Sequence, residues 1–129
     1  MKRARTLVAV AVAASAVTMM VVSPARAQVE PVLRLGPGDA CPSNYVCFFE
    51  RANFAEGGYA VAAGYSINDF QAIYFNDEMS SWVNNTNLYY CWYQHPNYVG
   101  IAYVMRPNSF VREEPESRDH TAASAAPCY

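Results

Sequence analysis

Short runs of β-branched and aromatic residues fill most of this chain, and glycine, proline and asparagine interrupt them every few residues. The runs lie at 46–50, 59–63 and 81–83, and again at 88–93, 101–105 and 109–112. No window has the period of a long amphipathic helix. The two sets of runs flank a polar linker, residues 84–87. This duplication predicts an all-β fold in which two Greek keys, residues 41–84 and 88–129, pack face to face as one small sandwich.

The first 27 residues have the three parts of a secretory signal peptide. Three basic side chains lie within the first five residues, an uncharged run follows at 6–22, and Ala25 and Ala27 precede the expected cleavage. The uncharged run is shorter than the roughly 20 residues that a membrane-spanning helix needs. We therefore predict a secreted, extracellular protein that begins at Gln28 and has no membrane partner after the signal is removed.

The part of the chain beyond the signal is acidic. Four of the nine Lys and Arg residues belong to the signal segment, which leaves 5 basic against 11 acidic side chains and a formal net charge of −6. A nucleic acid or an anionic membrane would release no counterions to such a surface, so neither is an expected partner. We read residues 28–40 as an extended leader and residues 41–129 as one domain that is a monomer.

Four cysteines, Cys41, Cys47, Cys91 and Cys128, all lie in the exported part. An even number in an oxidising compartment indicates two disulfides, for which three pairings exist. A zinc site is the alternative, but the chain has no Cys-x-x-Cys pair and no histidine at a ligand spacing. We favour pairing Cys41 with Cys47 across a short turn, and Cys91 with Cys128, which ties the C-terminal segment to a strand.

A repeated aromatic pattern identifies the expected fold more closely. In the second block Tyr93 and Tyr98 are separated by four residues, and Gly100 follows. In the first block Phe49 and Phe54 have the same spacing, but the glycine, Gly57, comes one residue late. Either a one-residue bulge places Gly57 in the left-handed conformation, or Glu56 takes that conformation under strain. We expect the bulge. The run 76–81, Asn-Asp-Glu-Met-Ser-Ser, completes the first block.

Together these motifs resemble those of βγ-crystallin Greek keys, in which paired aromatics bracket a folded-over hairpin. With the signal peptide, the Cys-Pro start of the domain and the Trp82-Val83-Asn84-Asn85 stretch, the chain resembles secreted bacterial peptidase inhibitors of this fold, typified by small metalloproteinase inhibitors. The resemblance implies a protein that inhibits an extracellular peptidase, such as a metallopeptidase, through a rigid exposed loop. It implies that Ser81 hydrogen-bonds the folded hairpin.

In βγ-crystallins the run at 76–81 can bind calcium, and the resemblance places Asn76, Asp77 and Ser80 at ligand positions. The matching stretch of the second block, read as residues 118–123, begins with a cation and has Ala122 where a hydroxyl is wanted. Half of the ligand set is therefore missing. We expect no required cofactor, and a calcium-binding structural or cell-surface module is the alternative function.

For the inhibitory loop we favour the surroundings of Cys91, with Trp92, Gln94, His95 and Asn97 as candidates, over the linker 84–87 and the bridged turn 42–46. A rigid loop loses little conformational entropy on binding. The opposing interpretation is that 91–93 is a core strand. No serine or cysteine has the context of a nucleophile, and the acidic run 113–116 is typical of a solvated loop. We therefore predict that the protein is not an enzyme; a secreted toxin or carbohydrate-binding module is a third alternative.

Overall fold

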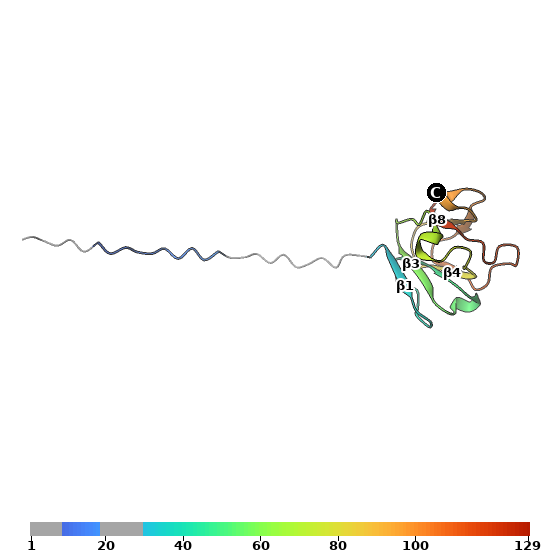
Figure 1. The fold of residues 1–129 in the computed structure, drawn as a ribbon, viewed down its shortest axis with the longest axis horizontal. Coiled ribbons are helices and arrows are strands. Elements are labelled where there is room, and N and C mark those ends of the chain that lie inside the picture. The colour runs from blue at the N-terminus through green and yellow to red at the C-terminus, as the bar shows by residue number, and fades with distance from the viewer. Residues whose placement is uncertain (1–8, 19–29) are drawn as a thin grey trace, which may run out of the picture.

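Figure 1 shows the computed structural model, which describes residues 9–18 and 30–129. The predicted cleavage after Ala27 lies outside the described residues. Within the described part, no helix is long and apolar enough to span a bilayer. Residues 30–129 form an all-β domain with two antiparallel sheets, which confirms the predicted fold class.

The domain consists of short elements joined by tight turns. In chain order they are β1 (Val32–Leu35), β2 (Tyr45–Phe49), the 3-10 helix η1 (Ala52–Phe54), β3 (Gly58–Ala62), the 3-10 helix η2 (Phe70–Ile73), β4 (Ser81–Asn84), β5 (Tyr90–Tyr93), the 3-10 helix η3 (Pro96–Tyr98), β6 (Tyr103–Met105), β7 (Ser109–Val111) and β8 (Ser124–Pro127).

The two blocks are interlocked as two Greek keys, because the second block adds a strand to the larger sheet and the first block adds a single β-bridge to the smaller one. The larger sheet has the order β1-β3-β2-β4-β7 and the smaller sheet the order β6-β5-β8. Strand β7 of the second block pairs with β4, where Trp82 lies opposite Val111. In return, Ile67 of the first block forms an antiparallel bridge with Ala125 of β8. The predicted sandwich of two Greek keys is therefore observed.

Two strands are absent from the sequence prediction. Within the predicted extended leader, residues 32–35 form β1, which lies along β3 at the edge of the larger sheet (Figure 1). Near the C-terminal end, residues 124–127 form β8, which pairs with β5. Both segments are short and weakly patterned, and each is extended because a distant strand offers it a pairing edge.

The core lies between the two sheets. Large side chains meet there from both layers, chiefly Val46, Phe48, Val61 and Trp82 from the larger sheet and Tyr90, Trp92, Met105 and Ala125 from the smaller one. Each fully buried large apolar side chain contributes roughly 1.5–3 kcal/mol to folding. Phe70 and Phe75 close one side of this core, at 5.9 Å between ring centroids.

The buried Tyr90 hydroxyl joins β5 to the turn after β3. It lies 3.2 Å from the Ala62 carbonyl and 2.9 Å from the Tyr65 carbonyl, and it accepts the Gly64 N–H at 2.9 Å. Burial raises the pKa of Tyr90 above its ordinary value of 10.0. The phenol therefore stays neutral and keeps this link at physiological pH.

The acidic run 113–116 is not uniformly solvated, which corrects the sequence interpretation. Glu113 and Glu116 are exposed, whereas Glu114 is 5% exposed. Its carboxylate accepts the Trp82 indole N–H at 2.7 Å and lies 3.1 Å from the Arg118 guanidinium. A buried carboxylate needs such partners, so Glu114 fixes the loop between β7 and β8 onto the core.

Candidate functional site

The two predicted aromatic pairs bracket two bent hairpins. The ring centroids of Phe49 and Phe54 lie 5.5 Å apart, and those of Tyr93 and Tyr98 lie 6.0 Å apart, both edge to face. At the tip of each hairpin, an asparagine and the second aromatic residue take the left-handed conformation; Asn97 has φ 58° and Tyr98 has φ 63°. The paired aromatics thus occupy the positions that the sequence pattern predicts.

In each hairpin, a serine from a distant strand forms two hydrogen bonds with the backbone. Ser81 accepts the Phe54 N–H at 3.1 Å and donates to the Arg51 carbonyl at 2.7 Å, as predicted for Ser81. Ser124 does the same in the second block: it accepts the Tyr98 N–H at 3.1 Å and donates to the His95 carbonyl at 2.6 Å. The sequence analysis did not identify Ser124. A signal was present, because Ser81 and Ser124 follow the second aromatic residue of their hairpins, Phe54 and Tyr98, at nearly the same sequence distance.

The predicted bulge in the first hairpin is wrong. Phe48 pairs with Tyr59 and Trp92 pairs with Tyr103, so both hairpins contain the same number of residues and the first has no extra one. Glu56 stands where the second hairpin has Gly100, and it takes the left-handed conformation itself, with φ 62°. Gly57 does take the expected left-handed conformation, with φ 77°, and a Cβ there would also lie 2.3 Å from the Leu35 carbonyl oxygen.

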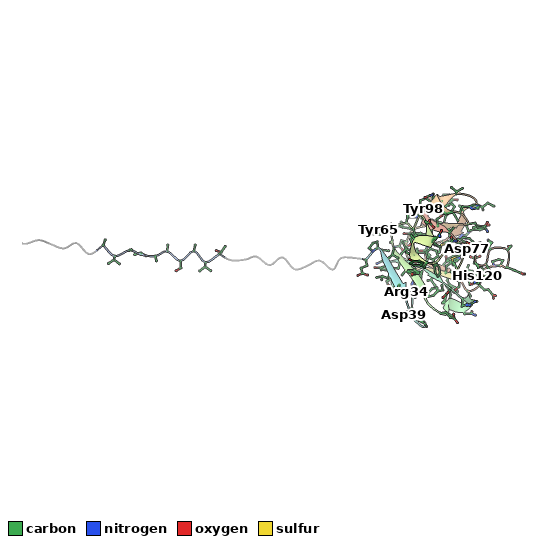
Figure 2. The ribbon with its side chains drawn as sticks, in the orientation of Figure 1. Arg34, Asp39, Tyr65, Asp77, Tyr98 and His120 are labelled. Atoms are coloured by element: carbon green, nitrogen blue, oxygen red, sulfur yellow. A yellow bond between two sulfur atoms is a disulfide. The ribbon has the colours of Figure 1, made fainter. Side chains whose placement is uncertain are left out.

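The second calcium-type motif begins one residue later than predicted, at Asp119 rather than Arg118. The backbone fixes this register by reciprocal hydrogen bonds: the Asp77 N–H donates to the Ala122 carbonyl and the His120 N–H donates to the Met79 carbonyl, each at 3.0 Å. Asp77 and His120 therefore correspond, and they lie side by side in Figure 2. Arg118 precedes the motif and sits 5.1 Å above the Tyr103 ring.

In this register the calcium-type loops remain poor in ligands. Ala123 stands where the first loop has the hydroxyl of Ser80, which is itself buried. The Asn76 amide donates to the Asp77 carboxylate at 3.1 Å, so one oxygen of Asp77 is already paired within the loop. Among the described residues, no group of three or more His, Cys, Asp or Glu side chains could hold a metal ion.

The candidates for the inhibitory loop divide sharply by burial. Cys91 and Trp92 are fully buried in β5, so they do not reach a partner. Gln94 is half-buried and donates to Thr121 at 3.1 Å. His95 and Asn97 are exposed. The structure therefore brings the five predicted residues together along one hairpin, but only its outer part faces solvent.

The outer part of this hairpin, residues 95–102, is exposed throughout. It displays two apolar side chains that the sequence analysis did not single out, Val99 at 56% and Ile101 at 71% exposure. Hydrogen bonds hold the hairpin to the body: the Asn97 N–H donates to the Asn68 carbonyl at 2.7 Å, and Ser124 bonds the first arm at His95 and the tip at Tyr98.

The two disulfides have the pairing expected from the sequence, Cys41 with Cys47 and Cys91 with Cys128. The second ties β5 to Cys128, the residue after β8, and the exposed hairpin begins at the other end of β5. Of the competing loops, the linker 84–87 is largely inside: Asn84 is fully buried, and its amide donates to the Leu88 and Met105 carbonyls. The bridged turn exposes Ser43 and Asn44, and it presents no large apolar side chain as open as Ile101.

Solved structures define the fold class. The chain superposes on a structure from work on the evolution of the eye lens βγ-crystallin domain fold, with a TM-score of 0.64, 18% identity and coverage of 74% of this chain and 94% of that chain. A βγ-crystallin from Ciona intestinalis gives a TM-score of 0.53 at 22% identity, covering 65% and 99%. A βγ-crystallin domain from Clostridium beijerinckii gives 0.52 at 16% identity, covering 64% and 94%. These likenesses establish the βγ-crystallin fold.

The sequence model of peptidase inhibitor family I36 matches residues 36–105, which run from the turn after β1 to the end of β6. The chain therefore belongs to peptidase inhibitor family I36. A peptidase inhibitor is a non-enzymatic protein, so the prediction that the chain is not an enzyme is confirmed at this level. No curated protein matches the chain.

Proposed function

We propose that this protein is a secreted inhibitor of extracellular peptidases, with metallopeptidases as the first class to test, and that it binds them through residues 95–102, which we call the second hairpin. Membership of a peptidase inhibitor family and two disulfides in one small domain support this proposal. The disulfides suit an oxidising, protease-rich environment.

The observation that carries the choice of hairpin is exposed apolar surface on a rigid support. Val99 and Ile101 face solvent while hydrogen bonds to Asn68 and Ser124 hold the hairpin. The Cys91–Cys128 disulfide bridges β5, the strand that leads into it. Preorganisation of this kind lowers the entropy lost on binding, and burying exposed apolar side chains in an interface contributes to its affinity. The first hairpin lacks such anchors, since Phe54 is half-buried and packs against Phe49 and Phe110.

The test is an inhibition panel of thermolysin-type and subtilisin-type peptidases. The full chain is expressed in a secreting host and recovered from the medium, where its mass should correspond to a first residue at Gln28. We expect stoichiometric inhibition of at least one peptidase at micromolar concentration or below. Full activity of every peptidase at a tenfold excess of the protein would contradict the proposal.

Val99→Asp should weaken inhibition at least tenfold, because it places a charge where an apolar contact is desolvated on binding. Ala55→Asp is the matched control. Ala55 is the corresponding residue of the first hairpin, is exposed, and has the same extended backbone as Val99. The control should inhibit like the unaltered protein. Equal effects of the two substitutions on the inhibition constant would argue against the second hairpin.

We propose further that inhibition needs no cofactor and that any calcium binds weakly at Asn76, Asp77 and Ser80. The ligand-poor second loop supports this expectation. The inhibition constant should be the same in the presence of a chelator and in millimolar calcium. Calcium should raise the melting temperature of the unaltered protein by less than about 2 °C. It should not raise the melting temperature of Asp77→Ala. A large rise that Asp77→Ala removes would favour the calcium-binding module instead.

A further inference from the structure

The two halves of the domain correspond strand for strand, but one edge is covered in the first half and open in the second. In the larger sheet, β1 pairs along the outer edge of β3. In the smaller sheet, β6 occupies the position of β3 and ends the sheet, paired among the described strands with β5 alone. The outer edge of β6 therefore corresponds to the edge of β3 that β1 covers, but no described strand pairs with it.

The cross-strand register gives the residue correspondence. Phe48 opposite Tyr59 matches Trp92 opposite Tyr103, so Ala60 in β3 corresponds to Val104 in β6. Leu33 of β1 lies opposite Ala60, which is fully buried in a small outer core. Among the described strands none lies on the outer side of Val104, which is 42% exposed.

The backbone of Val104 points outward at this edge. In an antiparallel sheet, successive residues direct their N–H and C=O groups alternately to the two neighbouring strands. The Cys128 N–H donates to the Tyr89 carbonyl at 2.9 Å, so alternate residues of β5, Tyr89 and Cys91, bond toward β8. Val104 lies opposite Cys91, and its own N–H and C=O therefore face away from β5.

The same alternation holds on the covered edge. The Ala62 N–H donates to the Pro31 carbonyl at 2.9 Å, so Ala62 and, two residues earlier, Ala60 bond toward the β1 side. Val104 is thus equivalent to Ala60 in its backbone direction as well as in its position. The first half of the molecule shows how a strand fits on such an edge.

The neighbouring loop leaves space for a strand. In the first half Phe75 packs on Tyr59, with ring centroids 5.4 Å apart, and it coexists with β1. In the second half Arg118 takes the corresponding place, 5.1 Å above Tyr103. The arrangement around the two edges is therefore alike apart from the missing strand.

We propose that an extended segment of the target peptidase adds to the open edge of β6 as an antiparallel strand, in the place that β1 occupies on β3. This inference rests on the proposed function and extends it, because the edge runs directly on from the second hairpin. Main-chain hydrogen bonds would supply affinity, and an apolar side chain opposite Val104, like Leu33 opposite Ala60, would supply specificity. A second copy of this chain is a poorer occupant, since two domains of net charge −6 repel each other.

The discriminating substitution is Val104→Pro. Proline removes the outward N–H and places its ring at the edge, yet it deletes no hydrogen bond to β5, and edge strands tolerate proline at such positions. The inhibition constant should rise at least tenfold. The matched control is Val104→Thr, which keeps the N–H and the branched shape and should change the constant less than threefold. Circular dichroism and the melting temperature check that both variants fold.

A second measurement on the unaltered protein does not depend on the variant's folding. The Val104 amide should exchange rapidly with solvent in the free protein, and its exchange should slow at least tenfold in the peptidase complex. In sedimentation, the free protein should behave as a monomer. If the unaltered protein inhibits but Val104→Pro folds and inhibits equally, or the Val104 amide stays unprotected in the complex, strand addition is refuted while the proposed function stands. Self-association that protects Val104 without peptidase would make a second copy the occupant and refute the proposal. Failure of the unaltered protein to inhibit any peptidase refutes both.

Discussion

Replacing Cys91 and Cys128 together by alanine should lower the free energy of unfolding by about 4 kcal/mol. This disulfide closes a loop with a sequence separation of 37, and it joins β5, the strand that leads into the second hairpin, to the residue after β8. Opening it restores the conformational freedom of that loop to the unfolded chain. For a domain of this size such a loss is a large part of the total stability. Urea denaturation monitored by tryptophan fluorescence measures it.

The other disulfide provides the internal comparison. Cys41 and Cys47 have a sequence separation of only 6, so the corresponding double alanine variant should lose about 2 kcal/mol. The larger loss should come with weaker inhibition, because the second hairpin stands on β5. Equal losses of stability in the two double variants would contradict the role given to the longer loop.

Glu114→Ala should lower the free energy of unfolding by about 2 kcal/mol. The substitution leaves the Trp82 indole N–H buried without an acceptor, and a buried unsatisfied donor costs about 1–3 kcal/mol. The contact with Arg118 adds little to this figure, since the Arg118 side chain is 37% exposed and solvent screens it. Thermal and urea unfolding are the measurements.

Glu116→Ala is the matched control in the same acidic run. Its side chain is exposed, and a surface substitution of this kind changes stability by about 0.5 kcal/mol or less. A Glu114→Ala variant as stable as Glu116→Ala would mean that the carboxylate does not anchor the loop.

Local patterns predicted the parts of the fold that depend on local geometry. The spacing of Tyr93 and Tyr98, repeated in Phe49 and Phe54, was sufficient to place both bent hairpins. The resemblance to βγ-crystallins implied that Ser81 hydrogen-bonds the folded hairpin, and it does so in the first block. The favoured disulfide pairing, which ties Cys128 to a strand, is the one observed. Each of these predictions rests on a short motif or on the cysteines, which the sequence shows directly.

Features set by distant partners could not be read from the sequence. The weak pattern at 32–35 gave no reason to expect β1, because what makes it a strand is the free edge of β3. Glu114 looked solvated, since its partner Trp82 is 32 residues away. The structure places the five predicted loop residues along one hairpin, and the inhibitory role of this hairpin stays a prediction. Cys91 and Trp92 proved to be core. The exposure of Val99 and Ile101 depends on which side of the hairpin the body covers, which the sequence does not show.

The central claim is that the second hairpin binds the peptidase. Hydrogen exchange tests it most directly, by comparing the free inhibitor with its complex with a peptidase that it inhibits. The first hairpin, in the same molecule, serves as the reference for the second. Peptides covering residues 95–105 should exchange more slowly in the complex, while those covering residues 51–61 should be unchanged. Protection of residues 51–61 or of the bridged turn at 42–46, with residues 95–105 unchanged, would contradict the assignment of the second hairpin as the peptidase-binding surface.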